Sequence, residues 1–304
     1  MNKYIYCAPL RCGFNDILCQ IAHAQYYSHK SGRILVIDTR YSSLYDRFDN
    51  YFITKNAFVN HDDEILKYFD TLDIYPDYMR GRISTYRGLL PSDLNHHNKP
   101  YQLPLSFDGE FRDYQQQVII HSICGDFGIG VFALEKMSLL PSVAAKIVGT
   151  LSLLGDDYDA IHVRNTDIGT DYFALFRAIF PQVRGRKLLV CSDDFGCREA
   201  AGKFFVESEV LTATHIPDTQ GKALHNSCVA GPEVYAKNLA MLTDLLALAR
   251  SKRLFYAPIS HGIKVGQISG FSFLANDLRQ RPYLVEQLLS GGLSSSEPKE
   301  VPQH

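Results

Sequence analysis

The sequence predicts an α/β protein built from parallel β-sheets that are covered by helices. Short apolar runs rich in β-branched residues alternate along the chain with segments of helical periodicity, which is the pattern of βαβ units. Hydrophobic residues make up 46% of the chain and charged residues 21%, the profile of a soluble globular protein. At 304 residues a single hydrophobic core becomes too large, so one large or two medium domains are expected.

The N-terminal segment predicts the first βαβ unit. Residues 3–9 and 33–38 are apolar and predict strands, while residues 14–30 predict the helix between them, which Gly32 closes. The apolar residues of this helix recur at helical spacing: Ile17, Ile21, Ala24 and Tyr27. A βαβ connection implies that its two strands lie parallel in a sheet covered by helices.

The middle of the chain is less regular. Residues 41–115 are rich in Tyr, Asp, Asn and His with weak periodicity, and residues 97–111 predict a loop. Residues 117–124 predict a buried strand, followed by the glycine-rich turn 125–130. The G-x-x-G-x-G spacing of that turn differs from the fingerprint of dinucleotide sites, and no acidic residue follows at the distance that such sites require.

Regular alternation resumes from residue 141, where a proline opens a helix. Helices are expected over 141–154, 171–180, 195–206 and 232–250, and strands over 159–165, 187–194, 209–214 and 253–258. A helix or mixed segment continues to about 289, and the Ser-, Gly- and Pro-rich tail 290–304 is expected to be disordered. We expect two Rossmann-like domains, 1–138 and 139–289, hinged near 130–142.

Charge and composition exclude several classes of protein. With 31 Lys and Arg against 33 Asp and Glu, the net charge of −2 argues against a nucleic-acid partner bound through the phosphate backbone. The sequence contains no apolar run long enough for a membrane span and no apolar region of a secretory signal. Its seven cysteines are odd in number and form no C-x-x-C pair, which favours reduced, buried thiols in a cytoplasmic protein.

Ligands of open parallel sheets bind at the carboxyl ends of the strands, and the segment 162–171 carries the most informative side chains there. His162 and Arg164 are separated by one residue, so their side chains share one face of the strand. An arginine is costly to bury without a partner, and its planar fork suits a phosphate. The alternative is that Arg164 pairs with Asp167 or Asp171 and makes the loop rigid.

Three further carboxylates stand out. Asp193 and Asp194 follow the next strand and could bind a metal, hold a sugar hydroxyl or orient Arg164, although no further metal ligands cluster nearby. Capping of the helix at 195 is the alternative for this pair. Asp244 lies within an apolar stripe of the helix 232–250, where a carboxylate is unusual unless it is paired or reaches a ligand.

Two turns favour an anion through free backbone N–H groups at a helix start. Gly13 precedes the first helix, with Asn15 beside it; an ordinary turn capped by Asn15 or Asp16 is the alternative. Ser260 and His261 follow the last clear strand, and we expect a helix to begin there.

Three segments resemble the fucosyltransferase superfamily that includes rhizobial nodulation fucosyltransferases and core α-1,6-fucosyltransferases. They are residues 11–40, 139–171 and 244–261, and the most specific part is H-V-R-x-T-D with the following G-T-acid. The resemblance implies a GT-B fold, in which two Rossmann-like domains face a cleft. It also implies a GDP-sugar donor, typically GDP-fucose, and inversion at the anomeric carbon without a metal or other cofactor.

The resemblance also implies roles for individual residues. Arg164 would contact the β-phosphate of the donor, His162 would bind the donor, and Ser260 would bind phosphate. Asp171 would act near the acceptor as the base. Asp193 and Asp194 would form the acidic pair that follows the next strand, and Asp244 would read the guanine. We place Gly13, Asn15, Asn165 and His261 on the donor side as well. The chain departs from the family where Asn165 replaces a second arginine, where the loop between Asp167 and Gly169 is one residue shorter, and where the base is Asp rather than Glu.

These observations predict a cytoplasmic glycosyltransferase that makes a surface glycan or lipid-linked saccharide, with peripheral association at the inner membrane face. Residues 41–115 would form much of the acceptor side. The second hypothesis is a non-catalytic nucleotide- or sugar-binding module on a degenerate transferase fold, prompted by Asn165 and the shorter loop. A phosphatase of the haloacid type, prompted by Ser192-Asp193-Asp194, is disfavoured because the early strand carries one Asp rather than D-x-D.

Overall fold

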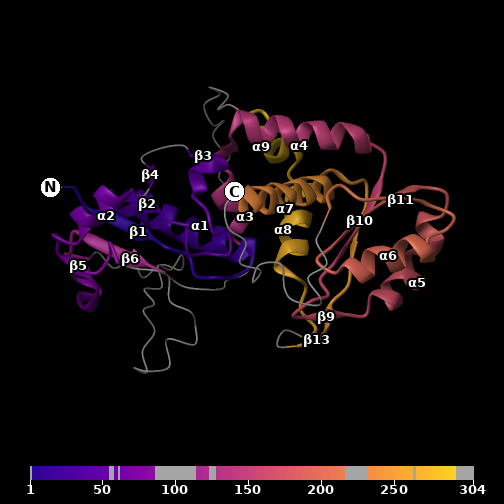
Figure 1. Cartoon of the computed structure of the whole chain (residues 1–304), viewed down its shortest axis with the longest axis horizontal. Helices are drawn as coiled ribbons and strands as arrows, with labels where there is room; N and C mark the ends of the chain where they lie inside the picture. Colours follow the sequence, from indigo (N-terminus) through magenta and orange to yellow (C-terminus); the bar gives the residue numbers. More distant parts are fainter. Residues whose placement is uncertain are drawn as a thin grey trace, which may run out of the picture.

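Figure 1 shows the fold of the chain as a computed structural model. The structure describes residues 2–54, 58–60, 62–85, 114–122, 128–215, 232–262 and 265–291. The loop expected at 97–111, the first half of the glycine-rich turn 125–130 and nearly all of the tail lie outside these residues.

The first half of the chain forms a five-stranded parallel sheet in the order β4-β2-β1-β6-β5. Its strands are β1 (Tyr4–Cys7), β2 (Ile34–Ile37), β4 (Phe58–Asn60), β5 (Ile74–Tyr75) and β6 (Val118–His121). Two helices accompany it, α1 (Phe14–Ser31) and α2 (Asp63–Phe69). Helix α1 ends at Gly32 in the left-handed conformation, with φ of 65°, so the predicted βαβ unit is confirmed in its helix stop as well as in its strands.

The second half forms a four-stranded parallel sheet in the order β11-β10-β8-β12. Its strands are β8 (Asp159–Val163), β10 (Lys187–Ser192), β11 (Glu209–Leu211) and β12 (Leu254–Tyr256). Four helices accompany it, α4 (Pro141–Leu154), α5 (Tyr172–Val183), α6 (Phe195–Phe204) and α7 (Pro232–Arg250). The elements expected in this half are therefore all present, and its strands are two or three residues shorter than predicted.

Short elements complete the described fold. They are the 3₁₀ turns Phe48–Asn50 and Asp77–Met79, the antiparallel pair β3 (Phe52–Thr54) and β7 (Met137–Leu139), the antiparallel pair β9 (Gly169–Thr170) and β13 (Ile259–His261), and the helices α3 (Gly130–Leu134), α8 (Gly270–Arg279) and α9 (Pro282–Leu289). Most of these were not predicted. The β3–β7 ladder ties the irregular middle region to the segment that precedes α4.

Side chains alternate across each sheet, so both faces are buried. In the first sheet, Tyr6 and Val36 pack toward α2, while Ile5 and Leu35 pack toward α1. In the second sheet, one face packs against α5 and α6 and the other against α4 and α7. Each sheet is thus the middle layer of a sandwich with helices on both faces, which confirms the predicted fold class.

Helices α7 and α8 lie between the two sheets, and α4 and α9 lie above them in this view (Figure 1). One continuous cluster of buried residues runs through them from the first sheet to the second. The C-terminal helices also turn back onto the first half, because α8 contacts α1 and α3 while α9 contacts β7. The domain boundary expected near residue 138 stays a prediction. None of the described helices is long and apolar enough to cross a membrane.

Candidate functional site

Arg164 lies directly after β8, at the carboxyl end of the second sheet. Its guanidinium Nη1 lies 2.7 Å from Asp193 Oδ2, and its Nη2 also pairs with Asp167. The side chain remains 19% exposed, so it is held by carboxylates and still reaches solvent. The two hypotheses for Arg164 are therefore compatible: acidic neighbours fix a guanidinium that stays partly exposed to solvent, where an anion could reach it.

The acidic pair after β10 fixes the loop that carries Arg164. Asp193 Oδ1 accepts a hydrogen bond of 2.7 Å from the backbone N–H of Asn165, and Asp194 Oδ2 accepts one of 2.6 Å from Asn165 Nδ2. Asp194 also caps α6 by accepting from the N–H of Gly196, as the capping alternative expected. Within the part of the chain that the structure describes, no three His, Cys, Asp or Glu side chains come together as a metal site would require.

His162 is buried on the same strand, with 7% of its surface exposed. Its Nδ1 lies 2.6 Å from the hydroxyl oxygen of Ser272, and its ring lies 5.1 Å from the ring of Phe271, both in α8. Burial, and secondarily the charges of Arg164 and Arg198, lower the pKa of His162 to about 3. The imidazole is therefore neutral in the folded protein at neutral pH, and it joins β8 to α8.

This neutral histidine makes stability depend on pH. Between pH 6.5 and about 3 the unfolded chain binds a proton at His162 that the folded chain does not, so stability falls as pH falls through this range. We expect His162→Gln to flatten this dependence by up to about 1.4 kcal/mol per pH unit, the effect of one proton. Urea unfolding of both proteins at pH 7, 5.5 and 4.5 measures it. Parallel pH profiles would contradict a buried neutral His162.

The helix expected to begin at Ser260 and His261 does not begin there. These residues belong to strand β13, which pairs with β9. The Ser260 hydroxyl donates a hydrogen bond of 3.1 Å to the carbonyl of Gly169. The helix starts later, at Gly270, with Ser269 as its N-cap residue. The Ser-Gly step directly before a helical run was the available signal for this start, and the prediction missed it. Ser260 and His261 thus lie beside the Arg164 loop through β9 rather than at a helix start.

The starts of three helices meet around Asn15. A Cβ on Gly130, the first residue of α3, would lie 2.5 Å from Asn15 Oδ1, and a Cβ on Gly270 would lie 3.4 Å from its Nδ2. Asn15 is 2% exposed, and its Nδ2 has no hydrogen-bond partner among the described residues. Gly13 is the N-cap residue of α1, and no side chain caps this helix. First-turn N–H groups of α1 and α8 therefore add positive potential in one place, next to His162.

Asp244 lies elsewhere in the second half, deep in α7. Its Oδ2 lies 3.0 Å from Arg198 Nη2, and its Oδ1 accepts a hydrogen bond of 2.9 Å from Thr214. Burial raises the pKa of Asp244, against the lowering effect of Arg198. The buried carboxylate is thus paired within the protein. Arg198 was not predicted from the sequence, because nothing in its helix distinguishes it from a surface arginine.

Asp171 ends the loop that begins at Arg164. Its Oδ1 accepts a hydrogen bond of 2.9 Å from the backbone N–H of Ala174, so Asp171 is the N-cap residue of α5. The residue is exposed. Its other carboxylate oxygen makes no hydrogen bond to the described residues, which leaves a basic atom open to a substrate hydroxyl.

The arrangement joins complementary groups. An oriented arginine, a neutral histidine and two helix starts suit a diphosphate anion, and an exposed carboxylate stands at the end of the same loop. Of the predicted residues, the structure brings His162, Arg164, Asn165, Asp193 and Asp194 into direct contact or adjacency. Strand β9 links Asp171, Ser260 and His261 to this group. Helix α8 links Gly13 and Asn15 to it, and Arg198 links Asp244 to it.

No family model and no curated protein matches the chain. Several solved structures are similar to it. The fucosyltransferase NodZ from Bradyrhizobium has a TM-score of 0.61 and 17% identity, with 91% of this chain and 94% of that chain covered. POFUT1 in complex with GDP-fucose is also similar, with a TM-score of 0.51 and 14% identity, and with 92% of this chain and 94% of that chain covered. NodZ alpha-1,6-fucosyltransferase co-crystallized with GDP is similar at a TM-score of 0.61 and 17% identity, covering 91% and 93%.

These similarities confirm the fold. Two Rossmann-like halves in the GT-B arrangement are what the sequence resemblance implied, and the fold is similar to that of NodZ and POFUT1. At these identities the likeness concerns architecture alone.

Proposed function

We propose that the protein is a glycosyltransferase that transfers a sugar, fucose from GDP-fucose, to a saccharide or lipid-linked saccharide. The observation that supports this most is Arg164, which Asp193 fixes at 2.7 Å at the end of β8 beside the neutral His162. That guanidinium would meet the donor diphosphate. The binding of GDP and GDP-fucose by proteins of the same fold supports the choice of donor.

Breaking the glycosidic bond builds negative charge on the leaving diphosphate. Arg164 and the N–H groups of the α1 and α8 starts would stabilise that charge more in the transition state than in the ground state. Because these groups are already oriented, no protein reorganisation is needed as the charge develops. We propose transfer with inversion and without a metal, since fixed cationic and N–H donors here take the role that a metal ion has in other transferases.

Asp171 is the proposed base. Its unbonded carboxylate oxygen would accept the proton of the acceptor hydroxyl as that oxygen attacks the anomeric carbon. Asn165 would have a supporting role, because both Asp193 and Asp194 hold it in place. Asp244 would read the guanine in its ion pair with Arg198.

The acceptor would enter from the first half of the chain, at the loops that follow its parallel strands. We propose that the enzyme works in the cytoplasm, peripherally at the inner membrane face where the acceptor is lipid-linked. A non-catalytic binding module is the competing proposal, since Asn165 replaces a second arginine. The two proposals differ in turnover and not in binding.

Nucleotide binding tests the donor class. We expect GDP, at 100 times its dissociation constant, to stabilise the protein by about 2.7 kcal/mol, which raises the melting temperature by roughly 5 °C. UDP, CMP and ADP at the same concentration serve as matched controls and should shift it far less. An equal shift with all four nucleotides, or none with GDP, would contradict the proposed donor. Release of fucose or of a fucosylated product then separates an enzyme from a binding module.

A further inference from the structure

Tyr45 has a backbone conformation that other non-glycine residues of the described chain avoid. Its φ is 52°, in the left-handed region, and its side chain is half-buried. Such a conformation costs about 1 kcal/mol or more and persists only where surrounding contacts impose it. Residues of this kind concentrate at ligand sites.

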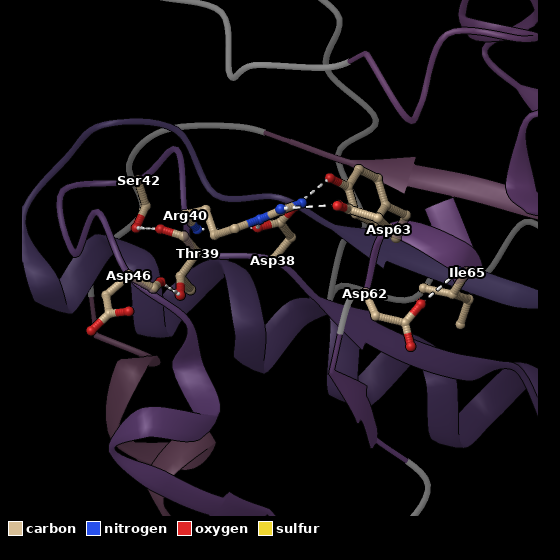
Figure 2. A network of polar contacts seen from close by, with 9 residues as sticks. Asp38, Thr39, Arg40, Ser42, Asp46, Asp62, Asp63 and Ile65 are labelled. Atoms are coloured by element: carbon tan, nitrogen blue, oxygen red, sulfur yellow. Dashed lines mark hydrogen bonds and ion pairs between the residues drawn. The ribbon is translucent and has the colours of Figure 1, made fainter. Parts of the chain in front are cut away.

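The loop that leads to Tyr45 is fixed by its own hydrogen bonds. Thr39 Oγ1 donates a hydrogen bond of 2.6 Å to the carbonyl of Asp46, and Ser42 Oγ donates one of 2.8 Å to the carbonyl of Thr39 (Figure 2). The loop begins at Asp38, a fully buried carboxylate that pairs with Arg40 at 3.0 Å (Figure 2). Tyr45 is therefore held from both sides along the chain.

Helix α7, from the other half of the molecule, holds the same loop. Lys237 Nζ donates a hydrogen bond of 3.0 Å to the carbonyl of Ser43, and Asn238 Nδ2 donates one of 2.8 Å to the carbonyl of Leu44. Both contacts act on the two residues that precede Tyr45. They explain how the unusual φ is maintained.

Two cations converge on the Tyr45 ring. The guanidinium carbon of Arg11 lies 5.1 Å from the ring centroid, and Lys237 Nζ lies 4.8 Å from it. Because both distances refer to one centroid, the two charges lie within about 10 Å of each other. Cation–π contact orients both side chains in advance, so two positive charges are held on one aromatic ring. We call Arg11, Tyr45 and Lys237 the Tyr45 cluster.

The position of the Tyr45 cluster connects it to the donor site. Arg11 is two residues before Gly13, the N-cap residue of α1. Lys237 precedes Asp244 by seven residues on α7, which is about 10 Å along a helix. Two of the three members come from loops at the carboxyl end of the first sheet, the half proposed to receive the acceptor.

We propose that the Tyr45 cluster binds an anionic group, a carboxylate or a phosphate, that is carried by the saccharide acceptor. This inference rests on the proposed function. Arg11 supplies a planar fork for two anionic oxygens and Lys237 a point charge, while the Tyr45 ring positions both. Arg164 and the helix starts already serve the diphosphate of the donor, so the Tyr45 cluster would select among acceptors.

Binding of defined sugars in the presence of saturating GDP tests the inference. The probes are glucuronic acid with glucose as its neutral counterpart, and N-acetylglucosamine 1-phosphate with N-acetylglucosamine. We expect the unaltered protein to bind at least one acidic probe roughly ten- to a hundredfold more tightly than its neutral counterpart, as a charge-assisted hydrogen bond provides. The pair that shows the preference identifies carboxylate or phosphate as the group recognised.

The variants localise that preference. Arg11→Gln and the double variant Arg11→Gln/Lys237→Gln should lose it, with GDP affinity changed less than twofold. The double variant Arg177→Gln/Lys203→Gln removes the same charges from exposed positions and should retain it. Tyr45→Phe keeps the aromatic ring and should retain the preference, whereas Tyr45→Leu should lose it.

The outcomes separate the inference from the function on which it rests. Normal GDP binding with equal affinity for acidic and neutral probes overturns the inference and leaves the donor proposal standing. A preference that survives in Arg11→Gln and in the double variant also overturns it. Absence of GDP binding overturns the proposed function instead. Because Arg11 is exposed, Arg11→Gln keeps the test valid if loss of the Lys237 contact to Ser43 disturbs the loop.

Discussion

Replacing Arg164 with alanine is expected to slow the breakdown of GDP-fucose, by transfer or by hydrolysis, by about 10²–10³-fold, the effect of losing one oriented donor to a developing negative charge. The fold should survive this change. Asp193, the carboxylate left behind, still accepts hydrogen bonds from the backbone of Asn165 and from the hydroxyl of Thr166. GDP release from GDP-fucose, together with thermal unfolding, measures both effects.

Two further variants sharpen this result. Arg177→Ala removes an exposed arginine from α5 and should leave turnover unchanged. Arg164→Lys keeps the charge but loses the fork that bridges Asp193 and Asp167, so we expect intermediate activity. Near-normal turnover in Arg164→Ala, at unchanged stability, would remove Arg164 from the reaction and the proposed mechanism with it.

Elements that are fixed by local patterns were predictable from the sequence. Helix α4 begins at Pro141 and ends before Gly155, and helix α1 ends at Gly32, so start and stop signals within a few residues set their bounds. Strand β8 and its histidine and arginine were predictable because one apolar run leads directly into polar side chains. The shared face of His162 and Arg164 follows from the period of a strand.

Elements that depend on distant partners were not predictable. Strand β3 has three residues and exists because it pairs with β7, more than 80 residues later. Ser260 was expected at a helix start, but pairing with β9 makes its segment a strand and moves the start of α8 to Gly270. Short segments carry too little periodicity to reveal such pairing, because tertiary contacts decide their conformation.

The same limit applies to the site. Asp244 was recognisable as a carboxylate among leucines, and such a carboxylate implies a partner. The sequence could not identify that partner as Arg198, because Arg198 lies in another helix, 46 residues earlier in the chain. The Tyr45 cluster likewise joins residues 11, 45 and 237, and nothing in the local sequence connects them.

Replacing Arg198 with methionine is expected to lower the free energy of unfolding by about 3–5 kcal/mol, because it leaves a buried carboxylate without its counter-charge. The side chains of Arg198 and Asp244 are only 8% and 12% exposed. Arg198 also donates to the backbone carbonyls of Ser192 and Thr214, which would lose a donor each. Urea unfolding at pH 7 measures the change.

A surface ion pair provides the matched control. Arg184 and Glu207 lie 2.6 Å apart, but their side chains are 65% and 41% exposed, so Arg184→Met should cost no more than about 1 kcal/mol. The double variant Arg198→Met/Asp244→Leu removes both buried charges and should recover most of the stability lost in Arg198→Met. A deficit in Arg198→Met that is no larger than in Arg184→Met would show that burial of the Arg198 pair is unimportant.

The pH dependence of the deficit identifies its cause. Burial already raises the pKa of Asp244, and removal of Arg198 takes away the charge that opposes this shift. In Arg198→Met the folded chain therefore binds a proton at higher pH than the unfolded chain does, so its stability relative to the unaltered protein should improve as pH falls from 7 toward 5. A deficit that stays constant over this range would assign the loss to the hydrogen bonds with Ser192 and Thr214 rather than to the buried charge. Because Asp244 is also the proposed reader of guanine, GDP affinity measured in the same variants shows whether the pair has a role in binding beyond its role in folding.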